Sequence, residues 1–285
     1  MPARLKYIAA MLIFGSVGLP VRWLPLPSGW IALLRGVIGC LFLLALRRPE
    51  PAAFKRNWIP LLISGTAIGL NWIFLFEAYR YTTVAVATLM YYLAPVLVLL
   101  LLPYVLKEKL TLKRWLTVGA ALVGMAFVSG VVPYGKLSGS RGIAMGFLAA
   151  CFYAAVMLAN RFFKDINGMD RTVYQLAIAA LAVLPYALLR EGFSVAWFDW
   201  RSVLLLLLLG IVYTGFAYWL YFDGLGQLPG QSAAILSYID PVAALLLSAA
   251  VLGERMSLWQ LLGAALILGA LLLNEIKIKV FRRHS

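Results

Sequence analysis

The chain has 285 residues, of which 64% are hydrophobic and 13% are charged, and its formal net charge is +14. Too few polar side chains are present to cover a water-soluble globule of this length, so the composition excludes a soluble enzyme or binding domain. A basic face against anionic lipid accounts for the positive charge, and we expect no nucleic-acid partner.

Continuous apolar runs of about 20 residues predict transmembrane helices, because a helix of this length crosses the hydrocarbon core of a bilayer. In chain order, ten such runs cover residues 5–24, 28–46, 58–79, 83–105, 112–132, 142–163, 171–190, 202–222, 231–252 and 258–276. The first run has no small-residue cleavage pattern, so we interpret it as a structural span. The pattern predicts an all-α polytopic membrane protein.

The second half of the chain repeats the first at one constant spacing. The polar, aromatic and proline matches pair Phe76 with Phe222, Glu77 with Asp223, Tyr92 with Tyr238, Pro95 with Pro241 and Glu108 with Glu254. We therefore predict two five-helix repeats, residues 1–137 and 138–285. Five crossings turn the second repeat upside down in the membrane, and two inverted copies are typical of an alternating-access transporter.

Basic residues indicate the orientation of the spans. They are concentrated in alternate connections, such as Arg47, Arg48, Lys55 and Arg56 after the second run. The positive-inside rule then predicts that both termini are cytoplasmic. We expect the protein in the cytoplasmic membrane of a prokaryote.

Two stretches resemble a known family. Ala78-Tyr79-Arg80-Tyr81-Thr82, which leads to Pro95, and Tyr238-Ile239-Asp240-Pro241-Val242-Ala243, which leads to Leu252-Gly253-Glu254-Arg255, are similar to the EamA repeats of the drug/metabolite transporter superfamily. Arg35 also lies where that family often carries an arginine in its second span. The resemblance implies ten helices around a central cavity, with the fifth and tenth spans packed outside it. It implies no substrate, because members of the superfamily export amino acids and other metabolites, carry nucleotide-sugars or move lipid-linked groups.

Two charged side chains are predicted deep in spans. Arg35 falls in the second run and Asp240 near the middle of the ninth. Charged groups at this depth cost about 2.5 to 3.5 kcal/mol each on insertion scales, so they are candidates for a functional role. Arg35 and Asp240 either neutralise each other or bind the two charged ends of a zwitterionic substrate.

Aromatic and amide side chains within the spans complete the predicted substrate site. Tyrosine and tryptophan stack on aromatic solutes or hold cations on a ring face, although some of these rings serve packing instead. The candidates are Trp72, Tyr92, Tyr153, Trp219 and Tyr238, together with the amides Asn71 and Gln175.

Two symmetric pairs are candidates for gating and coupling. Glu77 and Asp223 lie near the ends of the third and eighth runs and suit paired gates or proton-accepting sites, or else reach the membrane interface as ordinary surface carboxylates. Pro95 and Pro241 each remove a backbone donor within a span, which makes them either hinges or static kinks. Glu108 and Glu254 lie beside basic residues at helix ends, where we favour a structural role.

Motifs of enzymes are absent from the sequence. The single histidine is His284, next to the end of the chain, and Cys40 and Cys151 both fall within apolar runs. We therefore expect no enzyme activity, no metal and no cofactor. No P-loop is present, so a substrate or ion gradient must drive transport.

We predict a secondary transporter that works by alternating access. It exports a small amphipathic metabolite such as an aromatic amino acid, with or without proton coupling. An organic-cation or drug exporter is the alternative, and a lipid-group flippase is the alternative of another class. The glycine pairs Gly119/Gly124 and Gly263/Gly269 do not match a GxxxG dimer motif, so a monomer and a homodimer are both compatible with the sequence.

Overall fold

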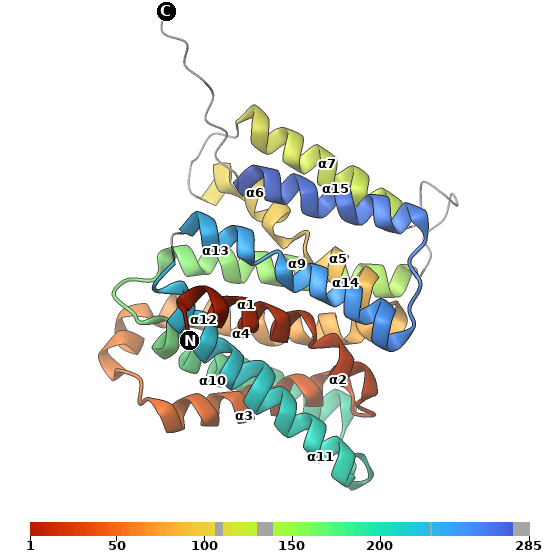
Figure 1. Ribbon diagram of the computed structural model, residues 1–285. Helices are drawn as coiled ribbons and strands as arrows, with labels where there is room; N and C mark the ends of the chain where they lie inside the picture. Colours follow the sequence, from red (N-terminus) through yellow and green to blue (C-terminus); the bar gives the residue numbers. More distant parts are fainter. Residues whose placement is uncertain (106–110, 130–138, 229, 276–285) are drawn as a thin grey trace, which may run out of the picture.

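The computed structural model describes residues 1–105, 111–129, 139–228 and 230–275, and in these residues every regular element is helical (Figure 1). The first repeat contains α1 (Ala3–Gly15), α2 (Gly18–Trp23), α3 (Ser28–Leu46), α4 (Pro51–Tyr81), α5 (Val84–Tyr91), α6 (Ala94–Val105) and α7 (Leu112–Val128). The second contains α9 (Ser140–Ala159), η1 (Asn160–Phe162), α10 (Gly168–Tyr186), η2 (Ala187–Glu191), η3 (Val195–Trp197), α11 (Trp200–Leu207), η4 (Leu208–Phe216), α12 (Ala217–Leu225), α13 (Gly230–Leu236), α14 (Ile239–Leu252) and α15 (Leu258–Glu275). The predicted repeat boundary at residues 137 and 138 lies outside the described residues.

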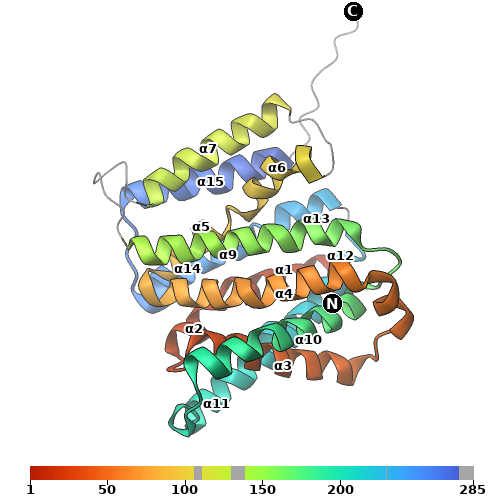
Figure 2. The same ribbon diagram turned by 180° about the vertical axis from the view of Figure 1, so that it is seen from behind.

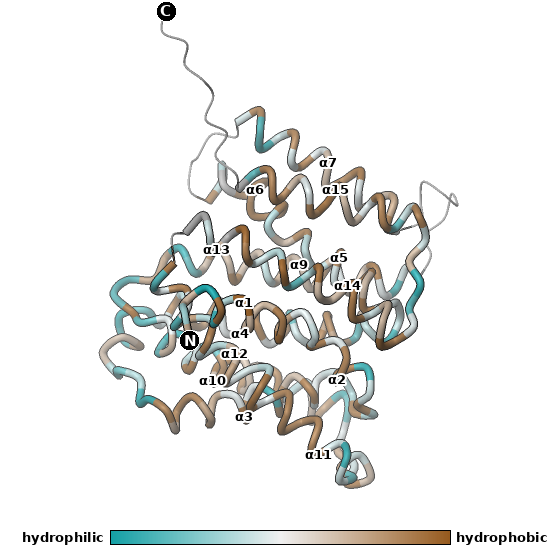
Figure 3. Tube along the Cα trace, viewed as in Figure 1, coloured by the Kyte–Doolittle hydropathy of each residue, from teal (hydrophilic) through white to brown (hydrophobic). Residues whose placement is uncertain are grey.

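Helices fill each of the ten predicted apolar runs within the described residues. Among these residues, seven helical segments are long and apolar enough to cross a membrane: Ala3–Trp23, Ser28–Leu46, Pro51–Tyr81, Val84–Leu101, Ser140–Phe162, Gly168–Glu191 and Trp200–Leu225. Two shorter apolar helices cover Ile239–Leu252 and Leu258–Asn274. Hydrophilic residues lie mostly toward the ends of the helices and hydrophobic residues along their lengths (Figure 3). The prediction of an all-α polytopic membrane protein is confirmed.

The helix in the third predicted run, α4, is longer than predicted: it begins at Pro51 and not at residue 58. The helix is broken at Asn57, whose backbone has φ −122° and ψ 20°. The Asn57 side chain bonds the connection after η1, donating to the Lys164 carbonyl at 2.8 Å and accepting from the Lys164 amide at 2.8 Å. A basic first turn therefore precedes the apolar part of α4.

The helix or helices that fill one predicted apolar run are called here a rod, and the rods are numbered like the runs. Three rods are interrupted near their middle, each a few residues before a proline. The breaks separate α1 from α2, α5 from α6 and α13 from α14, and Pro20, Pro95 and Pro241 follow them. A proline has no amide hydrogen to bond the carbonyl four residues earlier, so the preceding turn loses a hydrogen bond. The breaks before Pro95 and Pro241 occupy equivalent places in the two repeats.

Successive rods run in opposite directions, which reverses the second repeat. The start of α1 and the end of α15 lie at one end of the bundle, called here the terminal end, and the opposite end is called the far end (Figures 1 and 2). Helix α1 runs from the terminal end to the far end, whereas its counterpart α9 runs the other way (Figures 1 and 2).

The main contacts between helices are also equivalent in the two repeats: each has a counterpart in which the helices of one repeat are replaced by the matching helices of the other. Helix α4 packs against α9 as α12 packs against α1, and α3 contacts η4 as α10 contacts α4. Each of the pairs α3–α10, α5–α14 and α7–α15 joins a rod to its own counterpart. The two repeats are therefore related by an inverted two-fold arrangement.

Helices α7 and α15 form an outer layer, as the family resemblance implied (Figure 1). Gly124 and Gly263 allow the two backbones to meet, since a Cβ atom on Gly124 would lie 2.7 Å from the Gly263 carbonyl oxygen. For Gly119 and Gly269, no atom of another described element lies within 4 Å of such a Cβ position, so these glycines do not contribute to the contact.

Candidate functional site

A cavity of about 320 Å³ lies within the bundle, between helices of both repeats. This volume is at the lower end of the range for small-molecule sites. Most of the predicted substrate-binding residues line it: Arg35, Asn71, Trp72, Tyr92, Tyr153, Gln175 and Asp240. The lining extends from Tyr7 and Arg171, near the terminal end, to Tyr79, toward the far end.

Arg35 enters the cavity from α3 and is only 5% exposed. Its Nε donates to Thr214 Oγ1 at 3.0 Å, and its guanidinium carbon lies 4.3 Å from the centroid of the Trp72 ring. Thr214 in turn donates its hydroxyl hydrogen to the Leu209 carbonyl at 2.8 Å, which leaves a lone pair directed at the arginine. Within the described part of the chain Arg35 forms no ion pair, so it does not neutralise Asp240.

Asp240 lies in the first turn of α14, directly after the break in the ninth rod. A carboxylate at a helix N-terminus interacts favourably with the helix dipole. The Tyr92 hydroxyl, at the equivalent break in the fourth rod, lies next to the Asp240 carboxyl group. The two breaks thus bring one acidic and one phenolic group to the same wall of the cavity.

Tyrosine rings form much of the remaining wall. The rings of Tyr91 and Tyr153 are stacked with centroids 4.8 Å apart, and those of Tyr7 and Tyr221 are tilted with centroids 5.3 Å apart. The predicted site includes neither Tyr7 nor Tyr221, although both line the cavity. The helical spacing of Tyr218, Tyr221 and Phe222 does indicate a shared face.

Trp219 and Tyr238, by contrast, lie outside the lining. Helix α12 directs Tyr218, Tyr221 and Phe222 to the cavity, and Trp219 points to another side, where its ring stacks on Phe216 with centroids 5.7 Å apart. Around the second break, Ser237 and Asp240 line the cavity, whereas Tyr238 packs against the hydrophobic cluster of α5, α6, α7, α9 and α15. The rotation of a helix about its own axis decides which of its residues face the cavity. The limits of an apolar run do not predict this rotation.

The two predicted amides are engaged by the protein. Asn71 Nδ2 donates to the Ala149 carbonyl at 2.7 Å and so joins α4 to α9. Gln175 Nε2 donates to Ser64 Oγ at 2.8 Å and to Asn160 Oδ1 at 3.1 Å. Their amide hydrogens hold helices of different repeats together at the cavity wall.

Glu77 and Asp223, the two carboxylates predicted to act in gating or coupling, lie at opposite ends of the bundle, outside the cavity lining. Glu77 accepts a hydrogen bond of 2.7 Å from Ser28 Oγ toward the far end. Asp223 forms an ion pair of 2.5 Å with Lys6 Nζ toward the terminal end. Of the two prolines, Pro95 lines the cavity and Pro241 does not.

Glu254 joins the two repeats at the far end by a hydrogen bond. Its Oε2 accepts from the Val84 amide, at the start of α5, at 2.8 Å and also from Ser248 Oγ. Arg22 Nη1 donates to the Tyr79 carbonyl at the same end. Glu108, the sequence counterpart of Glu254, lies outside the described residues.

Comparisons with known proteins agree with this architecture. The profile of the EamA-like transporter family matches residues 2–130 and 140–275. The chain is 30% identical over 283 residues to the uncharacterized transporter YxxF of Bacillus subtilis, which covers 96% of this chain and 90% of that protein.

Two further relatives have more specific names. A probable amino-acid metabolite efflux pump of Salmonella typhimurium is 28% identical over 188 residues, which is 63% of each chain. The pseudopaline exporter CntI of Pseudomonas aeruginosa is 27% identical over 162 residues, which is 56% of each chain. A solved crystal structure superposes with a TM-score of 0.65 at 24% identity, covering 94% of this chain and 95% of the other, and this likeness concerns the fold alone.

Proposed function

Because this chain belongs to the EamA-like transporter family, it is a multi-pass membrane transporter, and we propose that it exports small amphipathic metabolites across the cytoplasmic membrane by alternating access. We further propose that both termini are cytoplasmic, that no ATP is hydrolysed and that aromatic amino acids are the first substrate class. A gradient of the substrate, or of protons carried by Glu77, Asp223 or Asp240, drives the cycle.

One observation carries the choice of substrate: Arg35 and Asp240 line the same cavity without forming an ion pair in the described chain. A guanidinium group binds a carboxylate with two parallel hydrogen bonds. Asp240 and the surrounding tyrosine faces suit an ammonium group. The stacked rings of Tyr91 and Tyr153 offer an apolar surface to the body of the substrate.

Alternating access is supported by the inverted repeats and the interrupted rods. The cavity lining reaches Tyr7 and Arg171 near the terminal end, while Glu254 and Arg22 hold the far end together. We interpret this conformation as inward-facing. In the outward-facing form, the start of α5 would separate from Glu254, with Pro95 and Pro241 at the bends.

Export of an organic cation is the second candidate, and Asp240 surrounded by tyrosines favours it. A simple cation leaves Arg35 without an anion in a buried position, which is costly. The amino acid accounts for both charges and is therefore preferred.

Uptake of labelled phenylalanine into proteoliposomes tests the proposal. We expect Arg35→Gln and Asp240→Asn each to reduce uptake by about tenfold or more, because a hydrogen bond to a charged group contributes about 1.5 to 3 kcal/mol. Arg161→Gln, which changes an exposed arginine at the terminal end, serves as the control and should leave uptake unchanged. Transport of tetraphenylphosphonium that persists in Arg35→Gln, without any phenylalanine transport by the wild type, would contradict the amino-acid proposal.

A pH gradient decides the driving force in the same vesicles. Faster uptake with a gradient than without it supports proton exchange. Equal rates under the two conditions exclude obligatory proton coupling.

A further inference from the structure

A second arginine, Arg171, lines the cavity near the terminal end and is the first residue of the predicted seventh run. Its guanidinium carbon lies 5.4 Å from the centroid of the Phe163 ring and 5.7 Å from that of Phe222. Its Nε is buried and has no hydrogen-bond partner within the described residues. The ring faces attract the guanidinium group, but among the described residues no carboxylate is paired with it.

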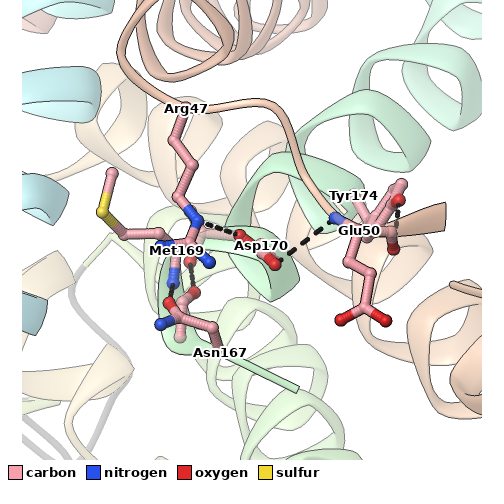
Figure 4. Close-up of polar contacts among 8 residues, drawn as sticks. Arg47, Glu50, Asn167, Met169, Asp170 and Tyr174 are labelled. Carbon is pink, nitrogen blue, oxygen red and sulfur yellow. Dashed lines mark hydrogen bonds and ion pairs between the residues drawn. The ribbon is translucent and has the colours of Figure 1, made fainter. Parts of the chain in front are cut away.

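The nearest acidic neighbour in sequence is directed elsewhere. Asp170 accepts from Arg47 Nε at 2.8 Å and from the Glu50 amide at 3.4 Å, as Figure 4 shows. Asp223, on α12, is paired with Lys6. Over the described ranges of the chain, Arg171 consequently takes part in no ion pair.

The charges of the cavity do not balance. Its described lining contains the cations Arg35 and Arg171 and one acidic residue, Asp240. An amino acid with a single carboxylate is neutral overall and leaves one arginine without a counter-ion. An uncompensated charge within a membrane protein is costly, so a substrate with one more anionic group is favoured.

Tyr218 links the two cationic positions. It lines the same cavity as Arg35 and Arg171. Because both arginines line one cavity of about 320 Å³, a single small molecule in that cavity has two cationic groups in its wall.

We propose that Arg171 is a second anion-binding residue of the cavity, and that the preferred substrate carries two carboxylates and one ammonium group on an aromatic or apolar body. The inference rests on the proposed function and refines its substrate class. Arg35 binds the deeper carboxylate, Arg171 binds the one nearer the terminal end, and Asp240 takes the ammonium group.

Two ligands that differ by one carboxylate test this inference: L-phenylalanine and 4-carboxy-L-phenylalanine. Their dissociation constants are measured on the purified full-length protein. We expect the wild type to bind the 4-carboxy compound about tenfold more tightly, as a charge-assisted hydrogen bond would provide. Arg171→Gln should abolish this preference, because the second carboxylate then has no cation to bind.

Two further variants separate charge from structure. Arg171→Lys keeps the charge and should retain part of the preference, whereas Arg161→Gln, at an exposed position of the same end, should retain all of it. The melting temperature of each unliganded variant shows that the fold is intact.

The possible failures are distinct. If the wild type binds both compounds equally, or if Arg171→Gln keeps the preference or weakens both ligands alike, the role of Arg171 is wrong and the amino-acid proposal stands. If the wild type binds neither compound, the proposed amino-acid substrate class is itself wrong.

Discussion

At the scale of single residues, the deep arginine is held in place by its neighbours. Thr214 accepts a hydrogen bond of 3.0 Å from Arg35 Nε, and the Trp72 ring lies 4.3 Å from the guanidinium carbon. Trp72 also lines the cavity, as the predicted substrate contact requires, and the arginine covers one face of its ring. Trp72 and Thr214 therefore orient the cation, and the free edge of the guanidinium group is left for a ligand.

Thr214→Val tests this orientation. Valine keeps the shape of the side chain and removes the oxygen that accepts from Arg35. We expect the affinity for phenylalanine to fall by about fivefold, in line with the roughly 1 kcal/mol of a typical hydrogen bond, while the melting temperature changes little. The measurement is the dissociation constant together with the melting temperature.

Thr117→Val is the matched control. Thr117 is also buried, but its hydroxyl donates to the Lys113 carbonyl of its own helix α7, outside the cavity. Its affinity should equal that of the wild type. An equal loss of affinity in both variants would show that the effect of Thr214→Val is not specific to Arg35.

At the scale of elements, the fourth and ninth rods are each two half-helices. The break falls at Tyr92–Leu93 in one and at Ser237–Tyr238 in the other, and each is followed by a proline. The same two rods contribute Tyr92 and Asp240 to one wall of the cavity. A bend at these points moves the half-helix at one end of the cavity relative to the half-helix at the other.

Pro95→Ala and Pro241→Ala test the breaks as hinges. Alanine restores a backbone donor and favours a continuous helix, so we expect the variants to be at least as stable as the wild type. If the bends take part in the cycle, the transport rate should fall by about tenfold with ligand affinity within about twofold of wild type. Rates in proteoliposomes and binding to the purified protein are compared.

Pro103→Ala, within the continuous helix α6, provides the control. It should transport at the wild-type rate. Unchanged rates in Pro95→Ala and Pro241→Ala would identify both prolines as static kinks.

At the scale of the whole molecule, equivalent residues of the two repeats make their contacts at opposite ends of the bundle. Glu77 bonds Ser28 at the far end, and its counterpart Asp223 pairs with Lys6 at the terminal end. Helix contacts follow the same exchange, as the pairs α4–α9 and α12–α1 show. The proposed alternating access would break such contacts at one end while those at the other end hold.

Labelling from each side of the membrane tests the orientation. The parent variant lacks thiols because Cys40 and Cys151 are replaced by alanine. Ala52→Cys and Ala196→Cys then add one exposed thiol each, at the start of α4 on the terminal end and in η3 on the far end. We expect a membrane-impermeant maleimide to label Ala52→Cys only from the cytoplasmic side and Ala196→Cys only from the opposite side. The reverse pattern would invert the proposed topology.

Much of the fold follows from the sequence, because each span is specified locally. A run of about 20 apolar residues must be helical in a bilayer wherever it lies in the chain. The sequence also showed that Arg35 and Asp240 lie within apolar runs, where a charged side chain is rare and costly. The early start of α4 was missed because Lys55, Arg56 and Asn57 interrupt the apolar run on which the prediction depends.

By itself, then, the sequence determined the helical class, the repeat and the deep charges, since these depend on hydropathy and on identity at a constant spacing. Only the tertiary structure decided which face of each helix meets the cavity. It directed Tyr221 and Arg171 inward and left Trp219 and Tyr238 outside. The physical reason is that contacts with distant helices, such as the hydrogen bond from Asn71 to Ala149, set the rotation of a helix about its axis. Hydropathy is nearly uniform around these helices and therefore does not predict that rotation.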